Sequence, residues 1–517
     1  MKNFIKEQKA YEIIIIIYLV VVLFGLPLVV HNGYYNIDVT KYYFYCGASV
    51  LLVPVLILKL KEKLSVREFF QSLSIAEKAL LIYWIISALS TLFSQYRFEA
   101  FWGNEGRFSG LMLMSIYVAA YFLITRCYKP HFICMYLCIL AGSLVFIFGI
   151  TDYFNLNLFH FKDIIAPKYA PIFMSTIGNI NFYSSYGVLI MGLVATLYTT
   201  WSTVAGATVY FLLMILSFLG LIVGNSDSTY LAVGALLAFL PLYLFQSRQG
   251  IRRYFMMVSG LLFSFMVVKV CDIYLSDIVL KPDGIRVMIG KWNNFLYLCL
   301  GIWGITAAIY IADYIFHRKE KDIGRKMQII WAIILAAVVM AIIGILIDAN
   351  FLGHAKRYGN LRSYVVFDDN WGTHRGYAWR KAVETYKNFP ILRKLLGNGP
   401  DTFGIISFFR DLAESEELYG EFFDSVHNEY LQFLVTIGPV ATVGYIVFLI
   451  LSIWDMIKSH YSPYVMGAGF GVLCYCIQAV VNINQPIATP IMWTLLAMGI
   501  AEYREGKYRS KKDSEHV

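Results

Sequence analysis

Charged residues are scarce in this chain of 517 residues: Asp, Glu, Lys and Arg make up 15% of it, against about 25% in an ordinary globular protein. Hydrophobic residues make up 59%, and the mean hydropathy is +0.62. So few polar side chains cannot cover a water-facing surface. The composition therefore excludes a soluble enzyme, a secreted disulfide scaffold and a disordered chain, and it predicts a membrane protein.

Metal-binding and nucleotide-binding patterns are also lacking. The eight cysteines lie in or beside apolar segments, without the histidine partners of a zinc site, so we interpret them as small apolar side chains. The chain has no Walker motif and no dinucleotide-binding glycine motif. We therefore predict no metal site, no cofactor and no ATP-driven transport by this chain alone.

The chain has instead a series of long apolar segments. A membrane-spanning helix needs about 20 mostly apolar residues, because lipid offers no partner to an unpaired backbone amide. Fourteen segments are candidates: 11–30, 43–60, 79–95, 108–125, 131–150, 182–200, 205–223, 229–246, 254–271, 295–316, 327–347, 429–453, 463–481 and 485–503. We predict an all-α polytopic membrane protein with about 14 transmembrane helices (12–14), of which 11 lie in residues 1–350 and three in residues 429–503.

The distribution of Lys and Arg predicts the orientation of these helices. With the N-terminus inside, the inner segments hold 24 of the 43 basic residues, the short outer loops hold eight, and the long outer loop 351–428 holds ten. Both termini, including the basic tail 504–517, are therefore expected in the cytoplasm. This asymmetry explains most of the net charge of +9, so the charge does not indicate a nucleic-acid partner.

The middles of the predicted spans hold almost no charge. Asp313 lies toward the cytoplasmic end of its span, Lys269 can extend outward, and Gln478 and Asn482 are uncharged. Ion-coupled transporters keep buried charges for their function. The pattern therefore disfavours a transporter, which stays an alternative.

Polar residues concentrate in the predicted outer loop 351–428, and a loop of this length is usually functional. The apolar spacing in residues 374–389 predicts a helix, which Pro390 ends. Residues 395–403 then predict a tight glycine turn. The loop is therefore expected to be partly helical.

His427 and Asn428 lie where the chain re-enters the membrane. An unperturbed histidine titrates near neutral pH, so it can act as a general base or acid. The alternative is an interfacial residue that caps a helix. His354 and His374 lack such a setting, and we interpret them as ordinary loop residues.

Three outer arginines are candidates for binding a diphosphate, because the guanidinium group is a planar, permanently charged fork. They are Arg107, in the short loop 102–110, Arg375 and Arg380. For Arg380 the alternative is an intrahelical ion pair with Glu384 at i+4. Arg375 has no acidic residue at i+3 or i+4, which leaves it freer to bind a ligand.

The order of these motifs resembles the O-antigen ligase and polymerase superfamily of bacterial polysaccharide membrane enzymes. The motifs are R-x3-W from Arg375 to Trp379, G-x-G-x3-F from Gly397 and Gly399 to Phe403, and H-N-x-Y-L from His427 and Asn428 through Tyr430 to Leu431. Three predicted spans follow. The resemblance covers the last third of the chain by motif and the first two thirds by topology.

The resemblance implies a metal-independent glycosyltransferase of the bacterial cytoplasmic (inner) membrane, whose active loop is extracytoplasmic. It would move a glycan from undecaprenyl diphosphate to an acceptor hydroxyl on a lipid, a protein or another glycan, in contact with membrane lipid. His427 would be the catalytic general base, and Arg375, Arg107 and Arg380 would hold the donor diphosphate. Supporting residues would be Asn428, Tyr430, Trp379, Gly397 and Gly399.

One departure from the family concerns a Ser-Arg pair that members often carry at the outer end of a middle span. This chain has residues 225–230, Asn-Ser-Asp-Ser-Thr-Tyr, at that place. One arginine expected at the diphosphate is therefore missing.

Several functions stay open at this point. Ligase and polymerase share the donor and differ in the acceptor; we favour a ligase and keep a repeat-unit polymerase as the alternative. A transporter or flippase for a polar solute or a lipid, and a non-catalytic assembly protein, are the alternatives of another class.

Overall fold

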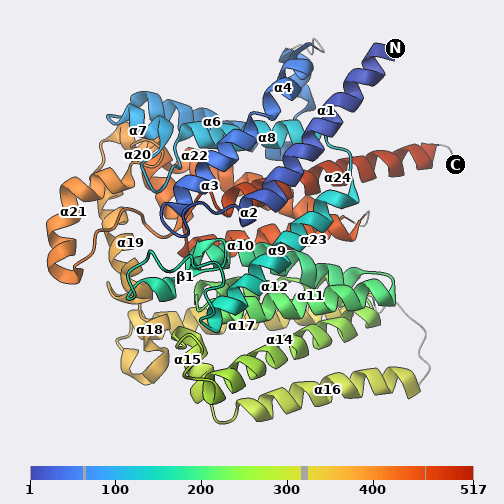
Figure 1. Ribbon diagram of the computed structural model, residues 1–517, viewed down its shortest axis with the longest axis vertical. Coiled ribbons are helices and arrows are strands. Elements are labelled where there is room, and N and C mark those ends of the chain that lie inside the picture. The colour runs from blue at the N-terminus through green and yellow to red at the C-terminus, as the bar shows by residue number, and fades with distance from the viewer. Residues whose placement is uncertain (1, 62–65, 316–323, 460–461, 516–517) are drawn as a thin grey trace.

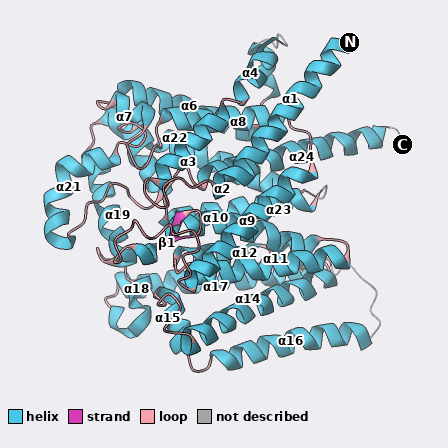
Figure 2. Cartoon of the chain, in the orientation of Figure 1, coloured by secondary structure: helices cyan, strands magenta, loops and turns pink. Residues whose placement is uncertain are grey.

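The computed structural model describes residues 2–61, 66–315, 324–459 and 462–515. In these ranges the chain is mostly helical, and its one small sheet pairs β1 (Phe173–Met174) with β2 (Gly178–Asn179) in antiparallel register. Figure 2 shows this composition: helices fill the view and the strands form one short element near its centre. The predicted all-α class is confirmed.

Eleven helical segments among the described residues are long and apolar enough to cross a membrane. They comprise α1 (Lys2–Val20) continuing into α2 (Leu26–Leu28), α3 (Ile37–Ser49) with α4 (Leu52–Lys61), α6 (Ile75–Phe93), α9 (Phe132–Tyr153), α10 (Ile180–Thr200), α11 (Val204–Val223), α14 (Arg248–Tyr274), α16 (Phe295–Ile315), α17 (Lys326–Asn350), α22 (Glu429–Ile457) and α23 (Pro463–Gln478). The chain is therefore a multi-pass membrane protein.

The exact count of fourteen spans is not confirmed. The three remaining candidates coincide with α8 (Leu111–Cys127), with α12 (Ser228–Phe239) followed by α13 (Pro241–Leu244), and with α24 (Thr489–Glu515). The first two are shorter than 18 residues or interrupted. In α24 the apolar stretch is followed directly by Glu502, Arg504 and Glu505, so charge enters the window needed to cross the bilayer.

The centre of the bundle is α10, whose most apolar stretch is 83% buried, whereas none of the corresponding stretch of α17 is buried. Its close neighbour is α23, and small residues allow the two backbones to approach. Gly192 of α10 lies against Phe470 and Gly471 of α23, so a larger side chain at Gly192 would overlap that backbone. Lipid-facing helices thus surround a core of backbone-to-backbone packing.

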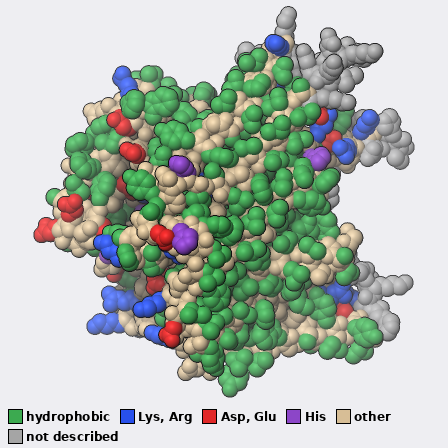
Figure 3. All heavy atoms as spheres, viewed as in Figure 1, with side chains coloured by type: hydrophobic (Ala, Val, Ile, Leu, Met, Phe, Trp, Pro, Cys, Tyr) green, Lys and Arg blue, Asp and Glu red, His purple; other side chains and the backbone are tan. Residues whose placement is uncertain are grey.

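Hydrophobic side chains cover the middle of the face in Figure 3, and charged side chains gather toward the two ends of the helices. The chain termini lie at one end of the bundle, on the right of Figure 1. The opposite end carries α7 (Arg97–Trp102), α15 (Gly284–Lys291) and the helices between α17 and α22, which are α18 (Arg362–Val365), α19 (Trp371–Asn388), α20 (Ile391–Leu396) and α21 (Phe403–Tyr419). The helix α5 (Val66–Ser72) completes the set.

Candidate active site

The segment between α17 and α22 is built from short helices, as its sequence predicts. Its longest apolar-faced helix, α19, becomes regular at Arg375, since Gly372, Thr373 and His374 have positive φ angles. It ends at Asn388, two residues before Pro390. The predicted helix 374–389 is therefore confirmed, and it presents Arg375 in its first regular turn.

A glycine turn after α20 docks this segment onto a break in α22. Gly438 has a φ of 77°, and Pro439 lacks the N–H that would bond Val435, so two carbonyl groups of α22 lose their helical partners. Asn398 N–H donates to Val435 O (3.2 Å) and Gly399 N–H donates to Thr436 O (2.8 Å). The turn thus replaces hydrogen bonds that the helix itself cannot make.

Gly397 and Gly399 are required at this turn for two separate reasons. Their φ angles are 78° and 111°, in the left-handed region that side chains avoid. A Cβ atom on Gly397 would also overlap the peptide between Thr436 and Ile437. A Cβ atom on Gly399 would instead overlap the side chains of Ser94 and Ala100.

Asp401, just after this turn, holds the loop that carries Arg107. Its carboxylate accepts hydrogen bonds from the backbone N–H groups of Asn104 (2.8 Å) and Ser109 (3.0 Å), and its backbone carbonyl accepts one from the Asn104 side chain. Burial raises the pKa of Asp401 to about 7, although the two N–H donors act to lower it. The loop between α7 and α8 is thereby fixed to the segment before α22.

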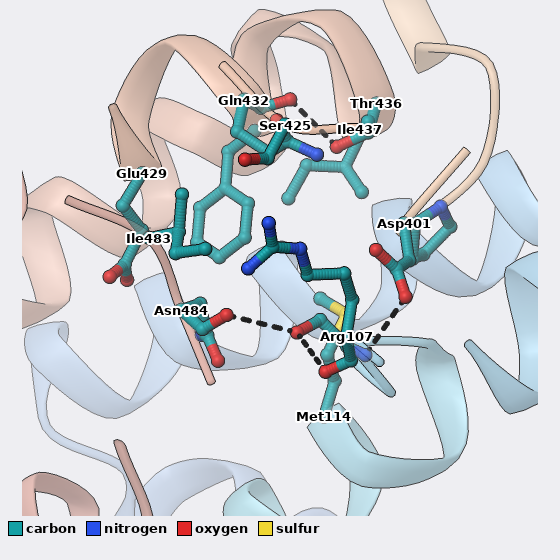
Figure 4. A pocket seen from close by; sticks show the side chains of 13 residues that line it. Arg107, Met114, Asp401, Ser425, Glu429, Gln432, Thr436, Ile437, Ile483 and Asn484 are labelled. Carbon is teal, nitrogen blue, oxygen red and sulfur yellow. Dashed lines mark hydrogen bonds between the residues drawn. The ribbon is translucent and has the colours of Figure 1, made fainter. Parts of the chain in front are cut away.

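Arg107 projects from this loop into a pocket, where Figure 4 shows its guanidinium directed toward Ser425 and Gln432. Its Nε and Nη2 atoms donate to the two carboxylate oxygens of Asp424, over 2.8 and 2.6 Å. Burial acts to raise the pKa of Asp424, but the Arg107 pair outweighs it and holds that pKa below its usual range. Arg107 is therefore already occupied by a carboxylate.

His427 follows Asp424 by three residues and is held in an unusual backbone conformation, with a φ of 53°. The next residue, Asn428, caps α22: its side-chain oxygen accepts the Leu431 N–H over 3.0 Å. The Gln432 side chain accepts the Val426 N–H on the other side of His427, over 3.0 Å. Asn428, rather than His427, is thus the helix cap.

The environment of His427 favours a neutral ring. Burial and the positive charges of Arg107 and Arg375 lower its pKa to about 3, against the opposite influence of Asp424. The side chain is only partly buried, so it stays accessible from outside. At neutral pH it is an unprotonated imidazole at the entrance of α22.

Of the three candidate arginines, Arg375 is the one whose guanidinium group is available to bind an anion. Within the described part of the chain, its guanidinium makes no hydrogen bond or salt bridge. Burial lowers its pKa, and the charge of Asp227 acts in the opposite direction. The structure therefore brings Arg375 into electrostatic reach of His427 with its fork uncommitted.

Arg380 is in a different situation on the exposed side of α19. It forms a two-bond pair with Asp369 (2.9 and 2.7 Å) and a further pair with Glu384 (3.0 Å). The intrahelical Glu384 pair, the alternative raised by the sequence, is confirmed. These acids, rather than a ligand, occupy Arg380.

Two aromatic residues of the motifs support the helices around the site. Tyr430 donates its hydroxyl to Cys476 O over 2.7 Å and joins α22 to α23. Trp379 packs with its ring centroid 5.0 Å from that of Trp371. The other loop histidines lie elsewhere: His354 pairs with Asp348 at 2.7 Å, and the His374 ring contacts Tyr419.

The segment that lacks the family's Ser-Arg pair lies beside another arginine. Arg286 of α15 approaches the Asn225 side chain at 3.5 Å, but Asp272 and the Leu280 carbonyl hold it more closely. Asp227 instead accepts the Tyr364 hydroxyl over 2.9 Å. Arg286 is therefore committed to the fold, and no arginine of residues 225–230 replaces the missing one.

The uncharged polar residues of the spans form a structural network. The Gln478 side chain donates to Ser184 (3.0 Å) and Ser228 (2.8 Å), and Asn482 donates to Ser185 (2.7 Å). These bonds join α10, α12 and the end of α23. Among the residues that the structure describes, no group of three or more His, Cys, Asp or Glu is arranged to hold a metal ion.

Sequence reasoning missed Asp401 and Asp424. Neither carboxylate is among the candidate site residues that the sequence predicts. The signal for Asp424 was its position three residues before His427, and the signal for Asp401 was its place directly after the glycine turn. Their partners, Arg107 and its loop, are about 300 residues away in the sequence, a separation that local patterns do not bridge.

Comparison with known proteins identifies one family in the same region. Residues 299–446, which begin within α16 and end within α22, match the family model described as O-antigen ligase. This region contains Arg375, the glycine turn, Asp424 and His427, whereas Arg107 lies outside it. No curated protein matches the chain.

Proposed function

From this O-antigen ligase domain, we propose that the protein is a membrane glycosyltransferase that moves a glycan from undecaprenyl diphosphate to an acceptor hydroxyl. The reaction takes place at the outer face of the bacterial cytoplasmic membrane, where residues 351–428 form the extracytoplasmic active loop. Both termini are cytoplasmic. The termini and the loop lie at opposite ends of the bundle, which supports this orientation.

One relationship carries the proposal: the positive charge of Arg375, in α19, acts on the ring of His427, in the segment before α22, and the Arg375 guanidinium makes no hydrogen bond within the described part of the chain. A lipid diphosphate leaving group needs positive charge, and a fixed arginine at an interface of low dielectric constant supplies it. The acceptor needs a base, and a neutral imidazole can take its proton. Arg375, which has no hydrogen-bonded partner among the described residues, can supply the positive charge, and the neutral His427 can supply the base.

The reaction follows from these two roles. His427 takes the proton of the acceptor hydroxyl as its oxygen attacks the anomeric carbon of the glycan. The new glycosidic C–O bond forms while the bond from that carbon to the diphosphate oxygen breaks, and the electron pair leaves with undecaprenyl diphosphate. Arg375 stabilises the negative charge of that leaving group, and the proton remains on His427.

The acceptor distinguishes two enzymes. We favour a ligase, which transfers the glycan to a lipid or protein, and a repeat-unit polymerase is the alternative with the same donor. The test follows undecaprenyl diphosphate-linked glycan in cells that lack the protein. Full-length lipid-linked polymer accumulates if it is a ligase, and single repeat units accumulate if it is a polymerase.

Complementation of these cells then tests the site. We expect His427→Ala and Arg375→Ala to abolish transfer at normal protein levels. The matched controls are His354→Ala and Arg357→Ala, because both residues pair with Asp348 in another part of the loop. Transfer by the His427→Ala variant, or accumulation of neither glycan species, would contradict the proposal. A transporter would instead retain flux after these loop substitutions.

A further inference from the structure

The Arg107–Asp424 pair raises a question that the proposed reaction leaves open. A diphosphate-binding arginine should present a free fork, yet Asp424 fills two positions of the Arg107 fork at 2.8 and 2.6 Å. Carboxylate and phosphate oxygens fit the same fork. Asp424 therefore occupies the place of an anionic ligand.

We infer that Asp424 is a positioning residue that exchanges partners during the reaction. In the donor-free protein it neutralises Arg107; when the donor diphosphate binds Arg107, Asp424 is displaced and turns to the imidazole of His427. This inference rests on the proposed function, and it names the residue that supports His427 when the ring carries a proton.

The accessibility of the pair permits the exchange. The Asp424 side chain is 41% exposed, whereas Arg107 is 18% exposed, so the carboxylate covers the arginine from the solvent side. Among the described residues, the Nη1 atom of Arg107 has no hydrogen-bond partner. A diphosphate can therefore engage Arg107 at Nη1 first and then replace the Asp424 oxygens.

The charges around His427 give the exchange its effect. The charged groups acting on the ring are Arg107 from the α7–α8 loop, Arg375 from α19, and Asp424 from the segment before α22. Two cations face one anion, and that anion is paired with Arg107. The donor-free site therefore opposes protonation of His427.

Donor binding reverses this balance. The diphosphate neutralises Arg107 and Arg375, and the released Asp424 lies three residues from His427 in a bent segment. The imidazolium formed when His427 takes the acceptor's proton then has a carboxylate beside it. His427 thus becomes a stronger base only when the donor is bound. The donor must therefore bind before His427 can take the acceptor's proton.

The first test uses the full-length protein in lipid nanodiscs with labelled histidine, and inorganic pyrophosphate as the probe. The His427 signal is assigned by its loss in His427→Gln and titrated by NMR. We expect pyrophosphate to raise the pKa of His427 by about one unit or more in the wild type, and by clearly less in Asp424→Asn. No rise in the wild type, or equal rises in both proteins, would overturn the inference.

Kinetics provide a second readout. Because Asp424→Asn removes the competitor for Arg107, we expect the donor KM to stay level or fall, while kcat falls roughly 10- to 100-fold. Asp424→Glu should restore much of kcat. A raised KM with unchanged kcat would indicate a merely structural role and would overturn the inference.

These outcomes are separable from failure of the proposed function. If His427→Ala retains transfer, the proposed function fails. If His427→Ala and Arg375→Ala are inactive but Asp424→Asn behaves as wild type in both readouts, only the exchange fails. If Asp424→Asn does not fold, the absence of a rise in the wild-type titration with pyrophosphate would still overturn the inference.

Discussion

Gly399 donates its backbone N–H to the carbonyl oxygen of Thr436 over 2.8 Å, and this bond fastens the segment between α17 and α22 to the interrupted helix α22. Ser94, at the end of α6, accepts the neighbouring Tyr96 N–H and donates its hydroxyl to Asn398 O over 2.6 Å. Three distant parts of the chain therefore meet at one turn.

Gly397→Ala should destabilise the protein and reduce transfer. The added Cβ would be held at a φ of 78° and would overlap the Thr436–Ile437 peptide. We expect a loss of about 2 kcal/mol or more in stability, since a strained backbone and a displaced segment both contribute. Thermal unfolding in detergent measures it. The control is Gly301→Ala in α16, where a Cβ would meet nothing within 4 Å, and an equal loss there would contradict the prediction.

Asn428→Ala should cost about 1 kcal/mol, because it removes the side-chain cap of α22. It should also lower transfer, since His427 is the residue directly before the cap. Asn428→Ser should restore most of both, because a hydroxyl can accept the same N–H. Unfolding temperature and in vitro transfer are measured side by side. A variant with full activity and unchanged stability would show that the cap is dispensable.

Arg375→Ala and Arg380→Ala should separate ligand binding from surface pairing. Arg375→Ala should reduce transfer by about 100-fold or more, as expected for removing a group that stabilises a leaving anion. Arg380→Ala should change stability by no more than about 1 kcal/mol and transfer little, since its exposed ion pairs are screened by water. Transfer assays on purified protein compare them. Equal losses would indicate that Arg380 also serves the ligand.

Asp401→Asn should change how stability depends on pH. The folded-state pKa of Asp401 is raised to about 7 from 3.8, so the folded protein binds this proton more tightly than the unfolded chain. Its contribution to stability is complete below about pH 4 and is lost as pH rises toward 7. Asparagine keeps an acceptor for Asn104 and Ser109 and cannot ionise. As the pH rises from 4 to 7, the unfolding temperature of the variant should therefore increase relative to that of the wild type.

The titration of His427 changes stability with pH in the opposite direction, so the experiment needs a control for it. Its pKa is lowered to about 3 from 6.5, so the unfolded chain binds this proton more tightly and stability rises with pH across that interval. The Asp401→Asn comparison is therefore repeated in a His427→Gln background. If the difference between the variants remains flat with pH, Asp401 is not the titrating group.

The elements that could be predicted from sequence are those specified by local periodicity and chain stops. The helix 374–389, its end before Pro390, the glycine turn and most spans follow from residues close together in the chain. The Arg380–Glu384 pair follows from helical spacing alone. By contrast, the predicted span 485–503 is not confirmed, because the apolar stretch of α24 runs directly into Glu502 and Arg504.

The site could be predicted only in part, because its key relations are long-range. That Arg107 is paired, and by which acid, depends on folding the α7–α8 loop against residues after α20. The backbone conformation of His427 also has no local signature, since few residues other than glycine adopt a φ of 53° and nothing in the sequence marks which of them do. The residue types were recognisable, but their pairing was not.

The tether from Asp401 to the backbone of Asn104 and Ser109 has a practical meaning for dissecting this protein. It joins the recognisable family region to a loop far upstream of it, so the boundary of the matched segment is not a boundary of the working unit. A fragment of residues 299–446, however well expressed, would lack Arg107 and the α7–α8 loop that positions it. It would also lack the end of α6, which contacts the glycine turn. Transferring that segment between relatives would succeed only if the α7–α8 loop and the end of α6 were transferred together with it.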